Sequence, residues 1–324
     1  MIARRRVLPL LVTFALALGG CAGSGVRDAS STDIEDPEIT IGLLPIVDVA
    51  PVQLAIVRGL FEQEGLTVSV EVVQGGAAAI PALVSGDLDI AYGNWVSFLL
   101  ANQEGLELRA IAGGVAAAPG FTELLARADS GLEGNPRGLA GTVIAVNTLQ
   151  NIGELAVRST LAAADLAVTD ATLVEIPFPE MGAALERGDV DVIWASEPVP
   201  TIVKQTLGAV VVADSFVGPM EGFPVAGYQA SAEYAARNPN TVAAFARALA
   251  AASELIADDP SLVTELVPTY TSLEAGLAGD LALPEYRPSM DVAALQRVHD
   301  RLITFEMLRP GLELSDLVVV AGGG

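Results

Sequence analysis

A repeated segment limits the folds open to this chain more than any other feature of its sequence. Residues 82–89 read ALVSGDLD and residues 184–191 read ALERGDVD, an offset of 102 positions. Residues 54–58 read LAIVR and residues 155–158 read LAVR, an offset of 101 positions. One inserted or deleted residue brings both matches into register, which indicates one supersecondary unit used twice. A chance match in a chain rich in Ala, Leu and Val is the alternative interpretation.

Each copy of the unit has the hydrophobic pattern of alternating strands and helices. In the first copy we expect strands over 38–44, 66–73 and 88–92, with helices over 51–65 and 76–86. In the second copy we expect strands over 142–146, 171–176 and 190–194, with helices over 151–164 and 180–187. This order is typical of parallel sheets with right-handed crossovers. The sequence therefore predicts an α/β fold of two lobes, each built on a small doubly wound sheet.

The rest of the chain is assigned to lobes by its composition. Strands predicted over 108–113 and 121–127 extend lobe 1, and the polar, Gly/Pro-rich residues 129–139 form a linker. Lobe 1 is therefore predicted to comprise 38–129 and 224–324, and lobe 2 to comprise 130–223. Helices are expected over 232–237, 240–257, 261–267 and 290–308, with Asn240 and Asp291 as N-caps. Two crossings between the lobes predict a hinge and a ligand cleft.

The N-terminal residues have the layout of an export signal. Arg4, Arg5 and Arg6 precede an apolar run over 7–18 that is short for a membrane span. Leu18-Gly19-Gly20-Cys21 follows and resembles the bacterial lipobox, which implies a signal peptide over 1–20 and lipid attachment at Cys21. An ordinary cleaved signal and a retained anchor helix are the alternatives. Residues 21–37 are predicted to be a lipidated N-terminus and flexible tether, because 22–37 are small, polar and acidic.

The charge and the rare residue types exclude several classes of function. The chain has 40 Asp and Glu against 17 Lys and Arg, a formal charge of −23, so we expect no nucleic-acid partner. Cys21 is the single cysteine, which allows no internal disulfide. His299 and Lys204 are the only histidine and lysine. No metal-ligand spacing results, and we expect neither metal nor cofactor.

Candidate ligand-binding residues lie in the loops after the predicted strands, where ligands of open parallel sheets bind. They are Asp48, Gly75, Gly76, Asn94, Trp95, Thr148, Asn151, Glu180, Met181 and Glu197. Several have a structural alternative: Asp48, Asn151, Glu180 and Met181 as helix-start residues, and Trp95 as a core residue. Glu197 is the charged candidate that we favour. These loops hold no Lys or Arg, so the acids favour a solute with nitrogen donors.

Residues 38–305 resemble solute-binding proteins of ABC importers, in the branch for alkanesulfonates, taurine, nitrate or thiamine-type pyrimidines. The segments GLFEQEGL (59–66) and SGDLDIAYG (85–93) carry most of the resemblance. It implies a two-lobe, type II periplasmic-binding-protein-like fold and delivery of a small solute to permease subunits with their ATPase, without catalysis. We further expect a monomer, held by its lipid on the outer face of the cell membrane, or in the periplasm of a Gram-negative cell.

Two rival functions remain open. Pyrimidine synthases of the same fold carry a reactive histidine and a cofactor-binding lysine near a cysteine-rich segment, but His299 and Lys204 lie on predicted helices and no cysteine cluster exists. The doublets Asp87/Asp89 and Asp189/Asp191 could act as acid–base pairs, although turn and capping roles fit their position better. A lipid-tethered solute sensor that feeds no permease is the second rival.

Overall fold

Two β-sheets carry the fold, and the same order of parallel strands recurs in both. The computed structural model describes residues 33–319 of the chain, and those from Ile34 onward form one unit. Sheet A has the order β11-β4-β10-β3-β1-β2 and sheet B the order β7-β6-β8-β5-β9. The predicted signal peptide (1–20), Cys21 and residues 22–32 lie outside the described range.

The strand and helix bounds follow the predicted repeat closely. Sheet A contains β1 (Glu38–Leu43), β2 (Thr67–Val72), β3 (Ile90–Asn94), β4 (Leu108–Ala116), β10 (Pro224–Ser231) and β11 (Glu285–Tyr286). Sheet B contains β5 (Thr122–Ala126), β6 (Val143–Val146), β7 (Thr172–Glu175), β8 (Val192–Ser196) and β9 (Val210–Asp214). In each sheet the first strand of the repeat pairs in parallel with the second and third.

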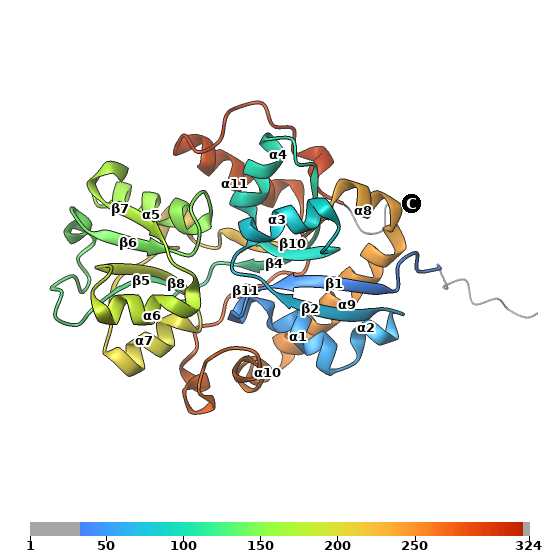
Figure 1. The fold of residues 1–324 in the computed structure, drawn as a ribbon, viewed down its shortest axis with the longest axis horizontal. Helices are drawn as coiled ribbons and strands as arrows, with labels where there is room; N and C mark the ends of the chain where they lie inside the picture. The colour runs from blue at the N-terminus through green and yellow to red at the C-terminus, as the bar shows by residue number, and fades with distance from the viewer. Residues whose placement is uncertain (1–32, 320–324) are drawn as a thin grey trace, which may run out of the picture. The chain divides into compact units, whose positions relative to one another are not determined.

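Helices cover both faces of each sheet (Figure 1). With sheet A lie α1 (Ala50–Val57), α2 (Leu60–Gln63), α3 (Gly76–Ser85), α4 (Trp95–Gln103), α8 (Ala232–Arg237), α9 (Pro239–Asp258), α10 (Ser261–Leu266) and α11 (Val292–Thr304). With sheet B lie α5 (Ile152–Ala163), α6 (Phe178–Arg187) and α7 (Val199–Leu207). We call sheet A with its helices lobe 1 and sheet B with its helices lobe 2. No helix of the described residues is long and apolar enough to cross a membrane.

The repeated GDxD segments tie each helix–strand turn to the first strand of its copy of the repeat, β1 or β6. Asp89 Oδ2 accepts a hydrogen bond from Thr40 N at 2.8 Å, and Asp191 Oδ2 accepts one from Val143 N at 2.8 Å. The Asp89 and Asp191 amides return bonds of 3.0 Å to the carbonyls of the same two residues. The carboxylates therefore have the turn and capping role, and the same contacts in both lobes support the internal repeat.

The predicted boundary of lobe 1 at residue 129 is wrong. The strand expected over 121–127 is β5, and it pairs antiparallel with β8 and β9 in sheet B. The chain therefore crosses earlier, between β4 and β5, and returns to sheet A before β10. Ala117 N donates to Phe223 O at 2.9 Å, so the two crossing segments run side by side.

The N-terminal end of the described chain and the C-terminal helices correct two further expectations. Asp291 caps α11 as predicted, accepting from Ala294 N at 2.7 Å. Asn240 is not a cap, because α9 begins one residue earlier and Asn238 is its N-cap residue. The Glu35 carboxylate instead accepts from the backbone N–H groups of Asn240 and Thr241 at 3.0 Å each. Glu35, assigned to the flexible tether, is thus fixed to the start of α9.

Candidate functional site

A cavity of about 40 Å³ lies between the two lobes, and both lobes line it. We call it the interlobe cavity. Its lining residues from lobe 1 are Leu44, Ile46, Asp48, Gly76, Tyr92, Gly93, Asn94, Val225 and Ala226. Those from lobe 2, with its entry segment, are Phe121, Thr122, Asn147, Ile152, Phe178, Trp194 and Ser196. The lining residues follow the carboxyl ends of β1, β3, β6 and β8, where open parallel sheets place their ligands.

Four helices begin at the interlobe cavity. Gly76, Ile152 and Phe178 are the first residues of α3, α5 and α6, and Asn94 is the N-cap of α4. Asn94 Oδ1 accepts from Ser97 N at 2.9 Å, so α4 is capped from within the protein. The N-cap residues of α3 and α6 supply no side-chain cap. The first-turn N–H groups of α3 are therefore available to a ligand, whereas α6 offers fewer, because Pro179 has no N–H and Glu180 N donates to Pro177 O at 2.9 Å.

Asp48 is the charged side chain of the interlobe cavity. It is 3% exposed, and its Oδ2 accepts from Tyr92 Oη at 2.9 Å and its Oδ1 from Ser196 Oγ at 3.3 Å. The α1 helix has no side-chain cap, so Asp48 does not have the capping role considered as its alternative. Burial raises the pKa of Asp48 to about 6, although the two hydroxyl donors oppose the shift. Because Ser196 belongs to lobe 2, the bond from its hydroxyl joins the lobes inside the cavity.

Four tyrosines lie near enough to Asp48 for its charge to act on their hydroxyls, and Tyr92 is bonded to it directly. Burial, with the Asp48 carboxylate adding to it, holds the pKa values of Tyr92, Tyr228, Tyr270 and Tyr286 well above their usual range. Tyr286 Oη donates to Val47 O at 2.9 Å. The Tyr228 and Tyr270 hydroxyls are buried and have no hydrogen-bond partner among the described residues. Asp48 therefore lies among neutral hydroxyl groups, with no cationic side chain lining its cavity.

Two lining residues that the sequence did not single out carry buried polar atoms without partners. Trp194 Nε1 and Thr122 Oγ1 are both buried and make no hydrogen bond within the described part of the chain. A buried donor left unsatisfied costs about 1–3 kcal/mol, so both atoms mark places where a solute atom would be stabilised. The sequence could have indicated Trp194 through the alternation of side chains along β8, because Trp194 and Ser196 lie on one face of that strand.

The lobes also touch near the cavity, at the segments that precede α3 and α5. A Cβ at Gly75 would lie 3.0 Å from Thr148 Cγ2 and 3.4 Å from Asn147 Nδ2. Ser97 Oγ donates to Gln150 O at 3.2 Å across the same gap. Gly75 thus permits close approach of the lobes, and Thr148 faces Gly75 rather than the cavity lining.

Gly75→Val should weaken solute binding roughly tenfold, because the added methyl groups overpack the contact with Thr148 and hold the lobes apart. The free energy of unfolding should change little, since Gly75 has extended backbone angles that valine adopts. Calorimetric titration of the variant with a bound solute measures the effect. Ala78→Val, at an exposed position of the same helix, is the control and should bind as the wild type does.

Four other predicted site residues do not line the interlobe cavity. Asn151 caps α5 by accepting from Gly153 N at 2.9 Å, and its Nδ2 donates to Asn147 and Thr148, so its hydrogen-bonding capacity is used within lobe 2. Trp95 is a core residue that packs edge-on against Phe98 at 5.5 Å. Glu180 is exposed and Met181 is buried in the core of lobe 2. Phe178, from the same turn of α6, takes the position at the cavity.

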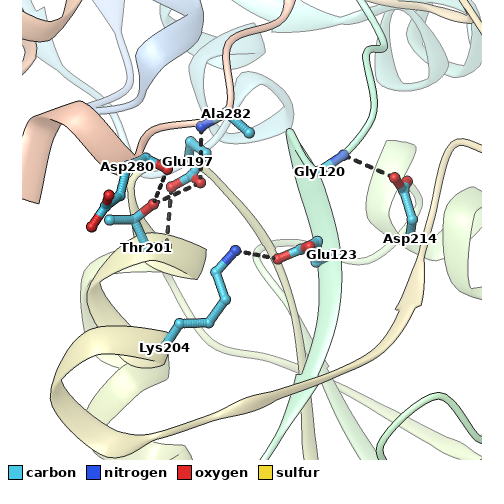
Figure 2. Close-up of polar contacts among 8 residues, drawn as sticks. All are labelled: Gly120, Glu123, Glu197, Thr201, Lys204, Asp214, Asp280 and Ala282. Atoms are coloured by element: carbon cyan, nitrogen blue, oxygen red, sulfur yellow. Dashed lines mark hydrogen bonds and ion pairs between the residues drawn. The ribbon is translucent and has the colours of Figure 1, made fainter.

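Glu197, the favoured charged candidate, points away from the interlobe cavity. It is fully buried, and its carboxylate accepts from Thr201 Oγ1 at 2.8 Å, Thr201 N at 3.1 Å and Ala282 N at 3.4 Å (Figure 2). Ala282 belongs to residues 274–286, which we call the strap because they lead from α10 to β11 of lobe 1 across α7. Burial raises the pKa of Glu197 to about 7. Glu197 therefore joins lobe 2 to the strap and has a structural role.

The two residues considered for enzymatic chemistry have local partners. Lys204 Nζ lies 2.9 Å from Glu123 Oε2, an ion pair between α7 and β5 (Figure 2). His299 Nδ1 lies 3.1 Å from Asp300 Oδ1 on α11. Neither residue lines the interlobe cavity. The described residues contain no group of three or more His, Cys, Asp or Glu side chains placed to hold a metal ion.

The sequence of residues 32–267 matches the model of the NMT1-like family. The chain belongs to the NMT1-like family. No curated protein sequence matches this NMT1-like chain. Its fold is confirmed by solved structures, which show the two-lobe architecture of periplasmic binding proteins that the sequence predicted.

Solved structures similar to this NMT1-like chain include two binding proteins and one enzyme. The alkanesulfonate-binding protein SsuA from Xanthomonas axonopodis pv. citri, bound to MOPS, has a TM-score of 0.75 at 19% identity and covers 87% of this chain and 98% of its own. The nitrate-binding protein NrtA from Synechocystis has a TM-score of 0.72 at 14% identity and covers 86% and 84%. The desulfurization enzyme DszB has a TM-score of 0.62 at 18% identity and covers 86% and 94%. The resemblance stated from the sequence is thus confirmed for family and fold.

Proposed function

We propose that this chain is the extracytoplasmic solute-binding component of an ABC importer. The interlobe cavity carries the proposal, since it buries the Asp48 carboxylate beside the unpartnered Trp194 Nε1 and Thr122 Oγ1. Polar atoms buried without partners are costly in a protein interior and are expected where a ligand completes their hydrogen bonds. Closure of the two lobes about the crossing segments would enclose a small solute there.

The solute class follows from the cavity and from the family. Sulfonates, taurine and nitrate are candidates because two uncapped helix N-termini meet the cavity. Nitrogen-bearing solutes, such as a thiamine-type pyrimidine, are candidates because Asp48 accepts hydrogen bonds and Phe178 and Trp194 offer ring faces. The absence of any Lys or Arg among the lining residues favours the nitrogen-bearing class.

A thermal-shift screen of the chain against sulfonates, nitrate, amino acids, polyamines and pyrimidines tests solute binding. A solute present at a hundred times its Kd should add about 2.7 kcal/mol to the free energy of unfolding. The proposal is contradicted if no solute shifts the melting temperature and none co-purifies in native mass spectrometry.

Membrane attachment through Cys21 and delivery to permease subunits complete the proposal. Cys21→Ala should release a solute-competent protein into the medium or leave the precursor uncleaved, which fractionation and immunoblotting measure. Membrane retention with normal processing would contradict lipid attachment. Uptake of labelled solute in a deletion strain separates an importer subunit from a tethered sensor, because only loss of the importer subunit lowers uptake.

A catalytic role fits the site less well than binding does. The NMT1-like fold includes an enzyme among its similar structures, but His299 and Lys204, the bases considered for such chemistry, lie outside the interlobe cavity. One aspartate of each doublet, Asp89 or Asp191, is occupied in a turn contact at the opposite end of its strand. We therefore propose binding without catalysis.

A further inference from the structure

The walls of the interlobe cavity combine one carboxylate with four aromatic rings. Asp48 is the only charged residue among those that line it, and no Lys, Arg or His is present. The rings are supplied by Tyr92 of β3, Trp194 of β8, Phe121 just before β5, and Phe178, the first residue of α6. Phe178 and Trp194 lie together, with their ring centroids 6.0 Å apart.

Resting on the proposed function, we propose that the solute of this protein is an organic cation. Its ammonium or amidinium head group is neutralised by Asp48 and faces the aromatic rings of the interlobe cavity.

The Asp48 carboxylate has unused capacity for such a head group. Its two protein donors, the Tyr92 and Ser196 hydroxyls, are neutral and leave the negative charge uncompensated. Each carboxylate oxygen has two lone pairs, so both can accept a further hydrogen bond. An uncompensated charge on a side chain that is 3% exposed is unfavourable, and an opposite charge on the solute removes that penalty.

Lobe 2 adds a second acceptor and the ring faces. Thr122 lies directly opposite Ser196 in the β5–β8 pair, so its hydroxyl is on the side of the cavity that meets Asp48. The Thr122 Oγ1 atom is buried and without a partner, and it can accept a bond from an ammonium N–H. Aromatic faces attract cations, most strongly where water is excluded.

The helix N-termini favour negative charge and are the strongest argument for an anion. Asn94 and Asn151 already cap α4 and α5 with their own side chains, and α6 offers few N–H groups, because Pro179 has none and Glu180 N donates to Pro177 O. The first turn of α3 is therefore the main free N-terminus at the cavity. No cationic side chain lines the cavity to add to the partial positive charge of a helix N-terminus. The formal charge of −23 also attracts cations to the protein and repels anions. A volume of about 40 Å³ fits a compact head group of a few atoms in the present lobe positions.

Calorimetric titration of the full chain with matched probes tests the proposal. Methylammonium, tetramethylammonium and choline are the cations, 3,3-dimethylbutan-1-ol is the uncharged isostere of choline, and methanesulfonate and nitrate are the anions. We expect at least one cation to bind, and choline to bind about tenfold or more tightly than its isostere. Binding of methanesulfonate or nitrate but of no cation overturns the cation proposal and leaves solute binding intact. Binding of none of the probes also overturns it.

Variants locate the interaction. Asp48→Asn should weaken cation binding roughly thirtyfold or more, because it removes the charge and keeps the shape. Glu180→Gln makes the same chemical change at an exposed position and should bind as the wild type does. Phe178→Leu should weaken cation binding about threefold to tenfold by removing one ring face. Undiminished cation binding by Asp48→Asn, with an unchanged melting temperature, overturns the assignment.

The pH dependence gives a readout that a structural role for Asp48 would not move. The charge of choline is fixed, and burial raises the pKa of Asp48 to about 6. Affinity for choline should therefore fall as the pH drops from 7 to 5, whereas affinity for an anion should rise.

Among the described groups near Asp48, Glu197 also has a pKa raised into this pH range. The tyrosines that face it have pKa values held above their usual range and stay neutral. Glu197, next to Ser196 in the chain, has a pKa raised to about 7. The titration is therefore repeated in Glu197→Gln, where the fall in choline affinity should persist; its disappearance overturns the role of Asp48.

Discussion

Replacing Trp95 with alanine should lower the free energy of unfolding by about 3–5 kcal/mol and leave solute affinity unchanged. The side chain is 1% exposed, and its ring fills the space over Gly227, where a Cβ would lie 2.3 Å from Trp95 Cζ2. Loss of the ring leaves a void between α4 and β10, whose lining atoms lose their dispersion contacts. Urea unfolding measures the stability and calorimetric titration measures the affinity.

Trp194→Ala is the matched comparison, since both tryptophans are 1% exposed. It should cost a similar free energy of unfolding and also reduce solute binding, because Trp194 lines the interlobe cavity and Trp95 does not. Each variant is titrated at a temperature where it is folded. A loss of affinity in Trp95→Ala that equals the loss in Trp194→Ala would contradict the position assigned to the site.

Glu197→Gln should remove much of the decline in stability that the wild type shows between about pH 4.5 and pH 7. The pKa of Glu197 is raised from 4.5 to about 7 in the folded chain, chiefly by burial. An acid with a raised pKa favours the folded state most below its unfolded pKa, and this contribution is lost as the pH rises through the folded pKa. The difference amounts to up to about 3 kcal/mol.

The hydrogen bonds around Glu197 leave room for a protonated carboxyl. Thr201 Oγ1 lies 2.8 Å from Glu197 Oε1 and 3.4 Å from Asp280 O, but a hydroxyl has one hydrogen. If Glu197 carries a proton and donates it to Thr201, the threonine hydrogen can go to Asp280 O. Glutamine can donate to Thr201 with its amide N–H, but it gives up the 3.4 Å bond that Oε1 accepts from Ala282 N.

Urea unfolding of the wild type and Glu197→Gln at pH 5 and pH 8 measures the effect. The wild type should lose more stability between the two pH values than the variant does. Asp48, with its pKa raised to about 6, contributes in the same direction to both proteins and so cancels in the comparison. Equal losses in both proteins would show that Glu197 is ionised in the folded state at low pH.

The sequence predicted the repeated part of the fold because the spacing of buried apolar residues there follows the strand or helix period. Ile39, Ile41 and Leu43, at every second position of β1, are buried in the core. Gly86 and Gly188 end α3 and α6 in the left-handed conformation. The lobe of β5 could not be predicted in this way. Its burial pattern fits either sheet, and only the antiparallel pairing with β8 and β9 places it.

The candidate site was predicted at the level of loops rather than of side chains. Asp48, Gly76 and Asn94 line the interlobe cavity as expected from their positions after strands. Ser196, which faces Asp48, and Glu197, which faces Thr201 and Ala282, are consecutive residues. Successive side chains along a strand point to opposite faces, so the residue after Ser196 faces away from the cavity. The charge of Glu197 alone was therefore a misleading guide to the ligand site. The role of the strap was not predictable, since Ala282 lies 85 residues from Glu197.

A crystal structure of the chain grown with its tightest-binding solute tests the central claim most directly. We expect one solute molecule enclosed between the lobes, with a polar atom within hydrogen-bonding distance of Asp48 and with Trp194 and Phe178 against it. A solute bound outside the cavity lined by these three residues, with the lobes unchanged, would show that the interlobe cavity is not the binding site.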